Sequence, residues 1–215
     1  MSKPFTIAID GTFASGKGTL SRRVAAHYGL AVLDTGKLYR AVARDVIAAG
    51  GSVEDEAFAA RIAARIDAAT LDDPALKSGG MGSAASKVSV HPAVRAALLS
   101  YQRDFAQNGA VLDGRDIGTV ILPDADVKLF VTAEPEVRAD RRYRELRGYG
   151  EDVTPEGVLE ALRERDHRDT TRATAPLKAA EDAHLLDTTE LSIDAAVSEA
   201  VRLIDAVLDA NAQDD

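Results

Sequence analysis

Gly11-Thr-Phe-Ala-Ser-Gly-Lys-Gly-Thr19 follows the apolar run Phe5-Thr-Ile-Ala-Ile9 and leads into a helix-like segment, Leu20 to Tyr28. An apolar strand, a glycine-bounded loop that ends in Gly-Lys, and the start of a helix are the parts of a phosphate-binding loop, or P-loop. The backbone N–H groups of such a loop and the positive end of the helix dipole hold nucleotide phosphates. Lys17 would reach the β- and γ-phosphates as a point charge.

The alternative is a chance match on an ordinary turn, but the position between a strand and a helix favours a working P-loop. Gly18 stands where a Ser or Thr usually follows the lysine, and the next hydroxyl belongs to Thr19. This argues against direct magnesium ligation by the loop. The four histidines show no metal-ligand spacing, so we expect no metal held by the protein alone.

The composition is that of a globular protein, with 46% hydrophobic and 28% charged residues among 215. A net charge of −9 disfavours binding to nucleic acid or to an anionic membrane. Cysteine is absent, which excludes disulfides and thiolate chemistry. The chain also has no uninterrupted apolar run long enough to span a bilayer. We expect a cytoplasmic protein, and a monomer.

Short apolar runs alternate with helical patterns, which predicts an α/β fold: a three-layer α/β/α P-loop core around a five-stranded parallel sheet. The predicted strands are 5–9, 31–33, 110–112, 127–131 and 184–186. The predicted helices are 20–28, 38–49, 53–69, 83–90, 92–107, 135–146, one restarting at Pro155, and a last one capped by Ser192 whose apolar stripe begins at Ile193. Residues 70–83 are expected to be irregular and mobile, and residues 211–215 a frayed tail.

These patterns predict a single kinase-like domain with two mobile parts. The core comprises residues 1–50, 91–141 and 173–215. A small acceptor-binding segment covers about 51–90, and a helical lid hairpin covers about 142–172.

Polar turns end two of the predicted strands, Asp34-Thr-Gly36 and Asp113-Gly-Arg-Asp116. In open parallel sheets, turns at the carboxyl ends of strands meet in one crevice beside the P-loop. Asp34, Thr35 and Arg40 are therefore candidate site residues. Helix capping is the alternative for Asp34 and Thr35, and a solvated helix face is the alternative for Arg40.

The segment from Arg138 to Arg172 holds nine arginines and no lysine. It also holds nine acidic residues, so a salt-bridged surface helix pair is one reading. The other is phosphate binding, because Arg165, Arg168 and Arg172 share one helical face and arginine grips phosphate bidentately. Together with the P-loop, this predicts two anion sites and phosphoryl transfer to a small phosphorylated acceptor under a closing hairpin.

At this point the chain resembles the bacterial cytidylate kinases over almost its whole length. The motifs that carry the resemblance are Gly16-Lys-Gly-Thr19, Asp34-Thr-Gly-Lys-Leu-Tyr-Arg40, Ala84-Ala-Ser-Lys-Val88, Val94-Arg-Ala-Ala-Leu98, Asp113-Gly-Arg-Asp-Ile-Gly-Thr119, Phe130, Arg165-Asp-His-Arg-Asp169 and Arg172-Ala-Thr-Ala-Pro-Leu177. The resemblance implies a kinase that uses ATP, with Mg²⁺ held mainly by the nucleotide phosphates, to phosphorylate CMP or dCMP in pyrimidine metabolism.

The resemblance also implies a role for each matching residue. The ATP loop would be Gly11, Thr12, Phe13, Ala14, Ser15, Gly16, Lys17, Gly18 and Thr19. On the acceptor side, Arg40 and Arg115 would bind the CMP phosphate; Ser86, Arg95 and Asp116 would read cytosine; Arg165 and Asp169 would lie near the ribose; and Thr35 would stand at a position usually held by serine. The catalytic charges would be Lys17 with the closing arginines Arg141 and Arg172.

Besides Thr35, the chain departs from that family in two places. Thr12, Phe13 and Ala14 stand where Pro, Ser and Gly are usual, and Phe13 is bulky for such a loop. The stretch between Asp67 and Ser83 is shorter than the family's small sheet-like insert, which leads us to expect weaker discrimination against UMP.

Two other functions fit parts of the pattern. One is a P-loop kinase for UMP or for an acceptor that is not a nucleotide. The other is a nucleotide-binding switch without transfer activity; the second, arginine-lined site and the lack of the Asn/Thr-Lys-x-Asp guanine reader of the GTPases argue against it.

Overall fold

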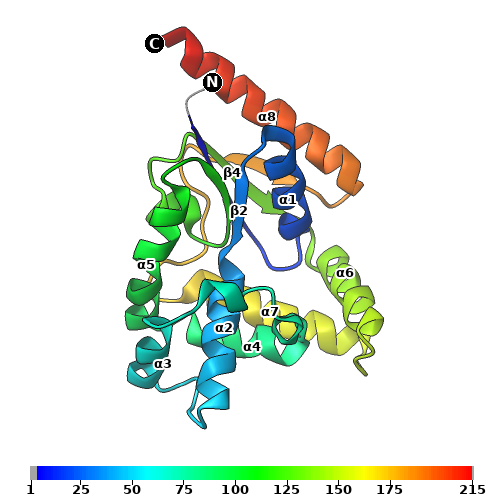
Figure 1. The fold of residues 1–215 in the computed structure, drawn as a ribbon. Coiled ribbons are helices and arrows are strands. Elements are labelled where there is room, and N and C mark those ends of the chain that lie inside the picture. The colour runs from blue at the N-terminus through cyan, green and yellow to red at the C-terminus, as the bar shows by residue number, and fades with distance from the viewer. Residues whose placement is uncertain (1–3, 215) are drawn as a thin grey trace.

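A computed structural model describes residues 4–214 of the chain (Figure 1). Its centre is a parallel sheet of five strands in the order β2-β3-β1-β4-β5. The strands are β1 (Thr6–Gly11), β2 (Ala31–Asp34), β3 (Ala110–Asp113), β4 (Val127–Thr132) and β5 (His184–Asp187). All five strands predicted from the sequence are confirmed, each within one or two residues.

The helices surround the sheet and extend beyond its carboxyl edge. They are α1 (Lys17–Tyr28), α2 (Thr35–Ala48), α3 (Glu56–Ala63), α4 (Gly79–Val88), α5 (Pro92–Ala106), α6 (Pro135–Gly148), α7 (Pro155–Thr171) and α8 (Ile193–Asp214). In Figure 1, α2, α3, α4 and α7 lie below the sheet, where the strands end, while α8 crosses its upper part. None of the helices in the described range is both long enough and apolar enough to cross a membrane.

Two apolar cores lie on opposite faces of the sheet, which makes the three layers. Successive residues of β1 point to opposite faces, so Ile7 and Ile9 pack with α1 and α8, while Ala8 packs with α2, α3 and α5. These three side chains are fully buried. β1 pairs with β3 on one side and with β4 on the other, so the loop that follows β1 starts from the centre of the sheet.

The helix predicted over 53–69 is wrong in its extent, since α3 covers only Glu56–Ala63. Asp55 caps its start by accepting a hydrogen bond from the Phe58 N–H at 2.9 Å. Beyond Ala63, side chains hold the backbone in turns: Asp67 accepts from the Ala69 N–H, and Arg44 donates to Thr70. Such side-chain bonds offer the backbone an alternative to helix.

The stretch 70–83 is also more regular than expected. A short 3₁₀ turn covers Pro74–Lys77, and α4 begins at Gly79 instead of Ser83. The glycines that suggested a loop sit inside α4 because its start is capped twice. Ser78 accepts from the Met81 N–H at 3.2 Å, and Glu151, distant in sequence, accepts from the Gly79 N–H at 2.8 Å.

The last helix differs from the expectation at both ends. Ser192 does cap it, since its hydroxyl accepts from the Ala195 N–H at 3.2 Å. Ile193, predicted to face the core, is 40% exposed. The predicted frayed tail is wrong up to Asp214, where α8 ends, and Asp215 lies outside the described residues.

Candidate active site

A cavity of about 670 Å³ opens at the carboxyl edge of the sheet. Its walls come from the loop after β1, the start of α2, the turn after β3, and the helices α6 and α7. Eleven lysines and arginines line it against five aspartates and glutamates. The cavity therefore carries a formal excess of six positive charges in a chain whose net charge is −9, so it is a local anion site.

The P-loop wraps back on itself around the carbonyl of Thr12. The Lys17 Nζ and the Ser15 hydroxyl each donate to that oxygen at 3.0 Å. Gly16 caps α1 in the left-handed region, with φ +89°. A Cβ on Gly11 would lie only 1.9 Å from the Val131 carbonyl oxygen, so only glycine allows the loop to leave β1 beside β4.

Lys17 is buried among charges of both signs. Burial and the nearby Arg115 lower its pKa, while Asp113 opposes that shift from 4.0 Å. Burial raises the pKa of Asp113, and the Asp34 carboxylate adds to this effect. Thr35 donates to the Asp113 carbonyl at 2.8 Å and so ties the two strand-end turns together. Negatively charged phosphates would supply the counter-charge that favours the protonated lysine.

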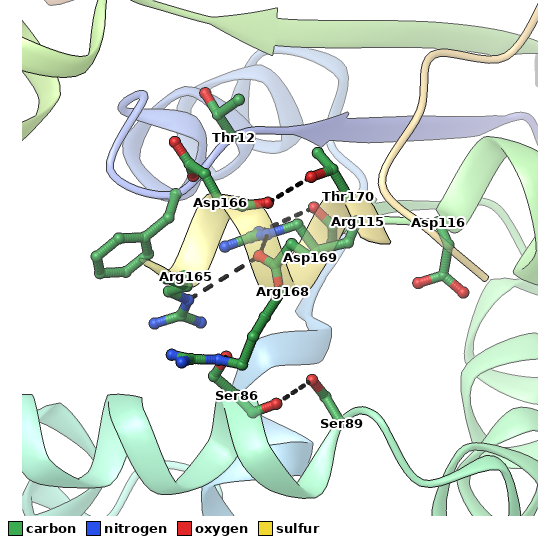
Figure 2. A network of polar contacts seen from close by, with 12 residues as sticks. Thr12, Ser86, Ser89, Arg115, Asp116, Arg165, Asp166, Arg168, Asp169 and Thr170 are labelled. Carbon is green, nitrogen blue, oxygen red and sulfur yellow. Dashed lines mark hydrogen bonds and ion pairs between the residues drawn. The ribbon is translucent and has the colours of Figure 1, made fainter. Parts of the chain in front are cut away.

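The turn after β3 is joined to α7 by a buried ion pair. The Arg115 Nε lies 2.9 Å from Oδ2 of Asp169, and the Arg165 Nε lies 4.0 Å from the same oxygen. Figure 2 shows the three side chains converging. Burial alone would raise the pKa of Asp169, but the two guanidinium groups hold it below its ordinary value. Asp169 is therefore an anionic acceptor for hydrogen bonds in the cavity.

Asp116 forms a second buried cluster. Arg95 on α5 pairs with one carboxylate oxygen, and Arg172 approaches the other at 3.4 Å. Arg95 also donates to the Ser89 carbonyl at 3.2 Å and lies over the Tyr39 ring, with Cζ 5.6 Å from its centroid. These contacts hold one guanidinium group and one carboxylate at the cavity wall. Together the two groups can donate hydrogen bonds to the polar edge of a nucleotide base and accept hydrogen bonds from it.

Asp10 on β1 holds the turn that carries this cluster. Its two carboxylate oxygens accept from the N–H groups of Ile117 and Gly118 at 2.7 and 2.8 Å. Those residues begin a wide helical turn, Ile117–Ile121, directly after Asp116. Burial raises the pKa of Asp10 to about 6, although both hydrogen bonds oppose the shift. The strand that leads into the P-loop thus supports the turn that carries Asp116.

Arg141 lies next to the P-loop through Thr188. It donates to the Thr188 carbonyl at 2.6 Å and to the Thr188 hydroxyl at 3.1 Å, and that hydroxyl in turn donates to the Ser15 carbonyl at 3.0 Å. Arg40 donates to the Leu76 carbonyl at 3.3 Å. Both side chains line the cavity.

The structure brings most of the predicted site residues to this one cavity. Those that line it are Phe13, Ala14, Gly16, Lys17, Gly18, Thr19, Thr35, Arg40, Arg95, Arg115, Asp116, Arg141, Arg165, Asp169 and Arg172. Gly11, Thr12 and Ser15 belong to the same loop but do not line the cavity, and the Ser15 hydroxyl donates to the Thr12 carbonyl. Ser86 is buried on α4 outside the lining, where its hydroxyl accepts from the Arg168 Nε at 3.2 Å (Figure 2).

Residues of the wall that sequence reasoning did not single out include Tyr39, Ser89 and Arg142. Tyr39 lies inside the motif that ends at Arg40 and Arg142 follows Arg141, so proximity to matched positions was the available signal. Ser89 follows the last residue of α4, three positions after Ser86, and lies just outside the matched motif 84–88, so no motif indicated it.

Comparisons with known proteins agree with this geometry. A family model described as cytidylate kinase matches residues 7–206. The cytidylate kinase of Rhodopseudomonas palustris strain ATCC BAA-98 / CGA009 is 55% identical over 203 residues, which cover 94% of this chain and 96% of that protein. The cytidylate kinase of Xanthobacter autotrophicus strain ATCC BAA-1158 / Py2 is 57% identical over 202 residues, covering 93% and 97%.

Solved structures share the fold at low sequence identity. A gluconokinase from Sinorhizobium meliloti 1021 aligns with a TM-score of 0.52 and 14% identity over 96% of this chain and 95% of its own. A shikimate kinase from Bacteroides thetaiotaomicron gives the same score and identity over 94% and 98%. These likenesses support the three-layer P-loop kinase fold and nothing finer.

The coverage of the two cytidylate kinases also bears on the short segment between Asp67 and Ser83. About 203 aligned residues cover nearly all of both partners, so neither carries a long insertion that the other lacks. These relatives are therefore of nearly the same overall length as this chain.

Proposed function

Because the chain belongs to the cytidylate kinase family, we propose that it transfers the γ-phosphoryl group of ATP to CMP or dCMP, giving ADP and CDP or dCDP. The observation that carries this proposal is that one cavity is lined both by the P-loop and by a facing wall of paired arginines and aspartates. Phosphoryl transfer needs in-line positioning and positive charge around the moving group, and this wall supplies both.

On the donor side, the backbone of residues 11–19 would hold the ATP phosphates, and Lys17 would contact the β- and γ-phosphates. Mg²⁺, when bound, would neutralise phosphate charge. The donor groups fit a metal held mainly by the nucleotide: a Cβ on Gly18 would lie 3.6 Å from Oδ2 of Asp113, so that carboxylate is close to the loop. Asp113 is the residue we would expect to contact the hydrated ion.

On the acceptor side, Arg40 and Arg115 would bind the phosphate of CMP. Arg95 and Asp116 would read the cytosine edge, with Ser86 joining them if α4 shifts, and Arg165 and Asp169 would lie at the ribose. Their existing ion pairs support these roles, because each pair keeps a guanidinium or carboxylate oriented in the cavity until substrate replaces its partner.

For the transfer itself, Arg141 and Arg172 would stabilise the charge on the moving phosphoryl group, and α6 and α7 would exclude water. Arg141 is already beside the P-loop through Thr188. Arg172 contacts Asp116, so it can contribute to transfer only after the acceptor displaces it. Division of the chain into a core, an acceptor segment (about 51–90) and a lid (about 142–172) fits this sequence of events.

A panel of nucleoside monophosphates with ATP, read as ADP release, tests the proposal. We expect CMP and dCMP to be the preferred acceptors. Preference for UMP, for a purine nucleotide or for an unphosphorylated acceptor would overturn it, and nucleotide binding without CMP-dependent turnover would favour the switch. The cytoplasmic location, the monomeric state and the lack of nucleic-acid binding stay predictions.

A further inference from the structure

Phe13, the bulky residue of the P-loop, lines the cavity and also contacts the helices beside it. Its side chain packs against the apolar cluster between α6 and α7, whose buried members are Ala139, Leu146, Val158 and Leu162. The donor loop therefore contributes a side chain to the core of the lid. A loop that only bound phosphate through its backbone would have no need of such a contact.

The Phe13 ring also faces two arginines of the lid. Cζ of Arg165 lies 4.0 Å from the ring centroid, and Cζ of Arg142 lies 5.6 Å from it. Both distances are within the range of cation–π attraction, which strengthens when the cation is desolvated. The Phe13 ring therefore packs against the guanidinium group of Arg165, the closer of the two arginines.

Arg165 has few other partners to hold it. Its Nε is buried without a hydrogen-bond partner, its Nη1 donates to the Gly82 carbonyl at 3.3 Å, and the nearest carboxylate oxygen, on Asp169, is 4.0 Å away. Burial and the positive charge of Arg115 lower its pKa to about 9. A buried cation with weak partners gains more than an exposed one from an aromatic face.

The backbone of Phe13 is tied to the lid as well. The Arg138 guanidinium on α6 donates to the Phe13 carbonyl at 3.1 Å and pairs with Asp166 on α7 at 2.7 Å. The ring and the carbonyl of one loop residue therefore contact both lid helices. Movement of residues 142–172 away from the core would separate the Phe13 ring from Arg142 and Arg165, and would also separate Arg138 from Asp166.

We propose that Phe13 is a positioning residue, which holds Arg165 and the α6–α7 pair over the cavity before substrate binds. The consequence for the reaction is on the acceptor side, because Arg165 shares Asp169 with Arg115. The kinetic part of this inference rests on the function proposed above, whereas the coupling of loop to lid does not.

The test compares Phe13→Leu, which keeps apolar bulk but removes the ring, with Phe13→Tyr, which keeps the ring. We expect Phe13→Leu to raise KM for CMP about five- to tenfold, to change KM for ATP less than about twofold, and to speed amide exchange in residues 155–171 of the free enzyme. Phe13→Tyr, which retains the ring, should show a smaller rise in KM for CMP and a smaller rise in amide exchange than Phe13→Leu. Exchange in β1 and β3 reports whether each variant is folded.

Phe5→Leu is the matched control, since Phe5 is also half-buried and packs edge-on against an aromatic ring, that of Tyr28, with the centroids 5.5 Å apart, but does not line the cavity. It should leave KM and the exchange of 155–171 unchanged. Wild-type kinetics and exchange in Phe13→Leu, or an equal rise in both KM values, would overturn the inference. A wild-type enzyme that ignores CMP would refute the proposed function instead, and exchange would still test the coupling.

Discussion

Lys17 is the charge on which we expect ATP binding and transfer to depend. It is buried at the start of α1, and its Nζ is anchored by the Thr12 carbonyl at 3.0 Å. A buried, positioned charge contributes to a transition state without reorganising, and its removal typically costs a hundredfold or more. We expect Lys17→Ala to lower kcat by at least about a hundredfold. Steady-state ADP release measures this, and near-normal turnover would contradict the mechanism.

Arg115 should matter for the acceptor more than for the donor. Its Nε lies 2.9 Å from Asp169, and its removal leaves that buried carboxylate with only the more distant Arg165. We expect Arg115→Ala to raise KM for CMP about tenfold or more while KM for ATP changes little. Arg23, paired with Asp194 at 2.5 Å on the outside of the molecule, is the matched arginine control. An equal loss in both KM values would contradict an acceptor role.

Asp10 should make stability depend on pH in an unusual direction. Its pKa rises from 3.8 to about 6 on folding, so between these values the folded chain holds a proton that the unfolded chain has released. Stability is therefore lost as pH rises through this window, by about 2–3 kcal/mol for this group. Asp10→Asn removes the effect, so the free energy of unfolding of wild type relative to the variant should fall between pH 4 and pH 6.5 or so. The free energies of unfolding of wild type and Asp10→Asn can be measured by urea denaturation. If the two changed in parallel across that range, the prediction would be wrong.

At the residue scale, the sequence predicted well which side chains lie in the cavity. It predicted less well which partners those side chains contact. Arg95, Asp116 and Arg172 were matched by motif, yet their mutual pairing depends on how α5 and the chain after α7 pack. Asp10 was passed over because an aspartate at a strand end has many possible partners. Only the fold identifies the N–H groups of Ile117 and Gly118 as its partners.

At the element scale, α4 and the lid are joined by hydrogen bonds from Arg165 and Arg168 and by one to a carboxylate at the start of the helix. Glu151, in the turn between α6 and α7, accepts the Gly79 N–H at the start of α4. A carboxylate at a helix N-terminus is stabilising by about 0.3–1 kcal/mol, and the hydrogen bond adds to this. Glu151→Ala should therefore loosen both elements and raise KM for CMP about threefold, with faster amide exchange in 79–83. Glu160, exposed on α7, is the control position.

If exchange in α4 were unchanged in Glu151→Ala, the contact would not govern the position of the helix. The same contact explains why the sequence misjudged α4. Three glycines predict a loop from local propensity, and the stabilising partner lies 72 residues away. The strands were easier, because short apolar runs bounded by turns are visible without knowing their neighbours, even at the partly exposed edge strands β2 and β5.

The short segment between Asp67 and Ser83 belongs to this scale too. It is packed through Arg44, which pairs with Asp73 at 2.9 Å and bonds Thr70. Weaker discrimination against UMP stays a prediction, and catalytic-efficiency ratios for CMP and UMP, compared with relatives that carry a full insert, would test it. Equal CMP-to-UMP ratios of catalytic efficiency would contradict the prediction of weaker discrimination.

For the whole molecule, the contrast between an acidic chain and a basic cavity gives a test with salt. If the net charge of −9 governed encounter, added salt would screen repulsion and speed the capture of anionic nucleotides. The cavity's formal excess of six positive charges predicts the opposite. We expect kcat/KM for CMP to fall several-fold between about 50 and 300 mM KCl. A rise would mean that the global charge dominates.

The strand order also has a consequence for how the protein is made. β1 and β2 both pair with β3, and Ala110 is the register partner of Thr6 on one side and of Ala31 on the other. A ribosome therefore releases the first two strands long before the segment that joins them exists. Until β3 emerges, these apolar strands have no sheet to enter, so the nascent chain must be kept from aggregating during about the first half of its synthesis.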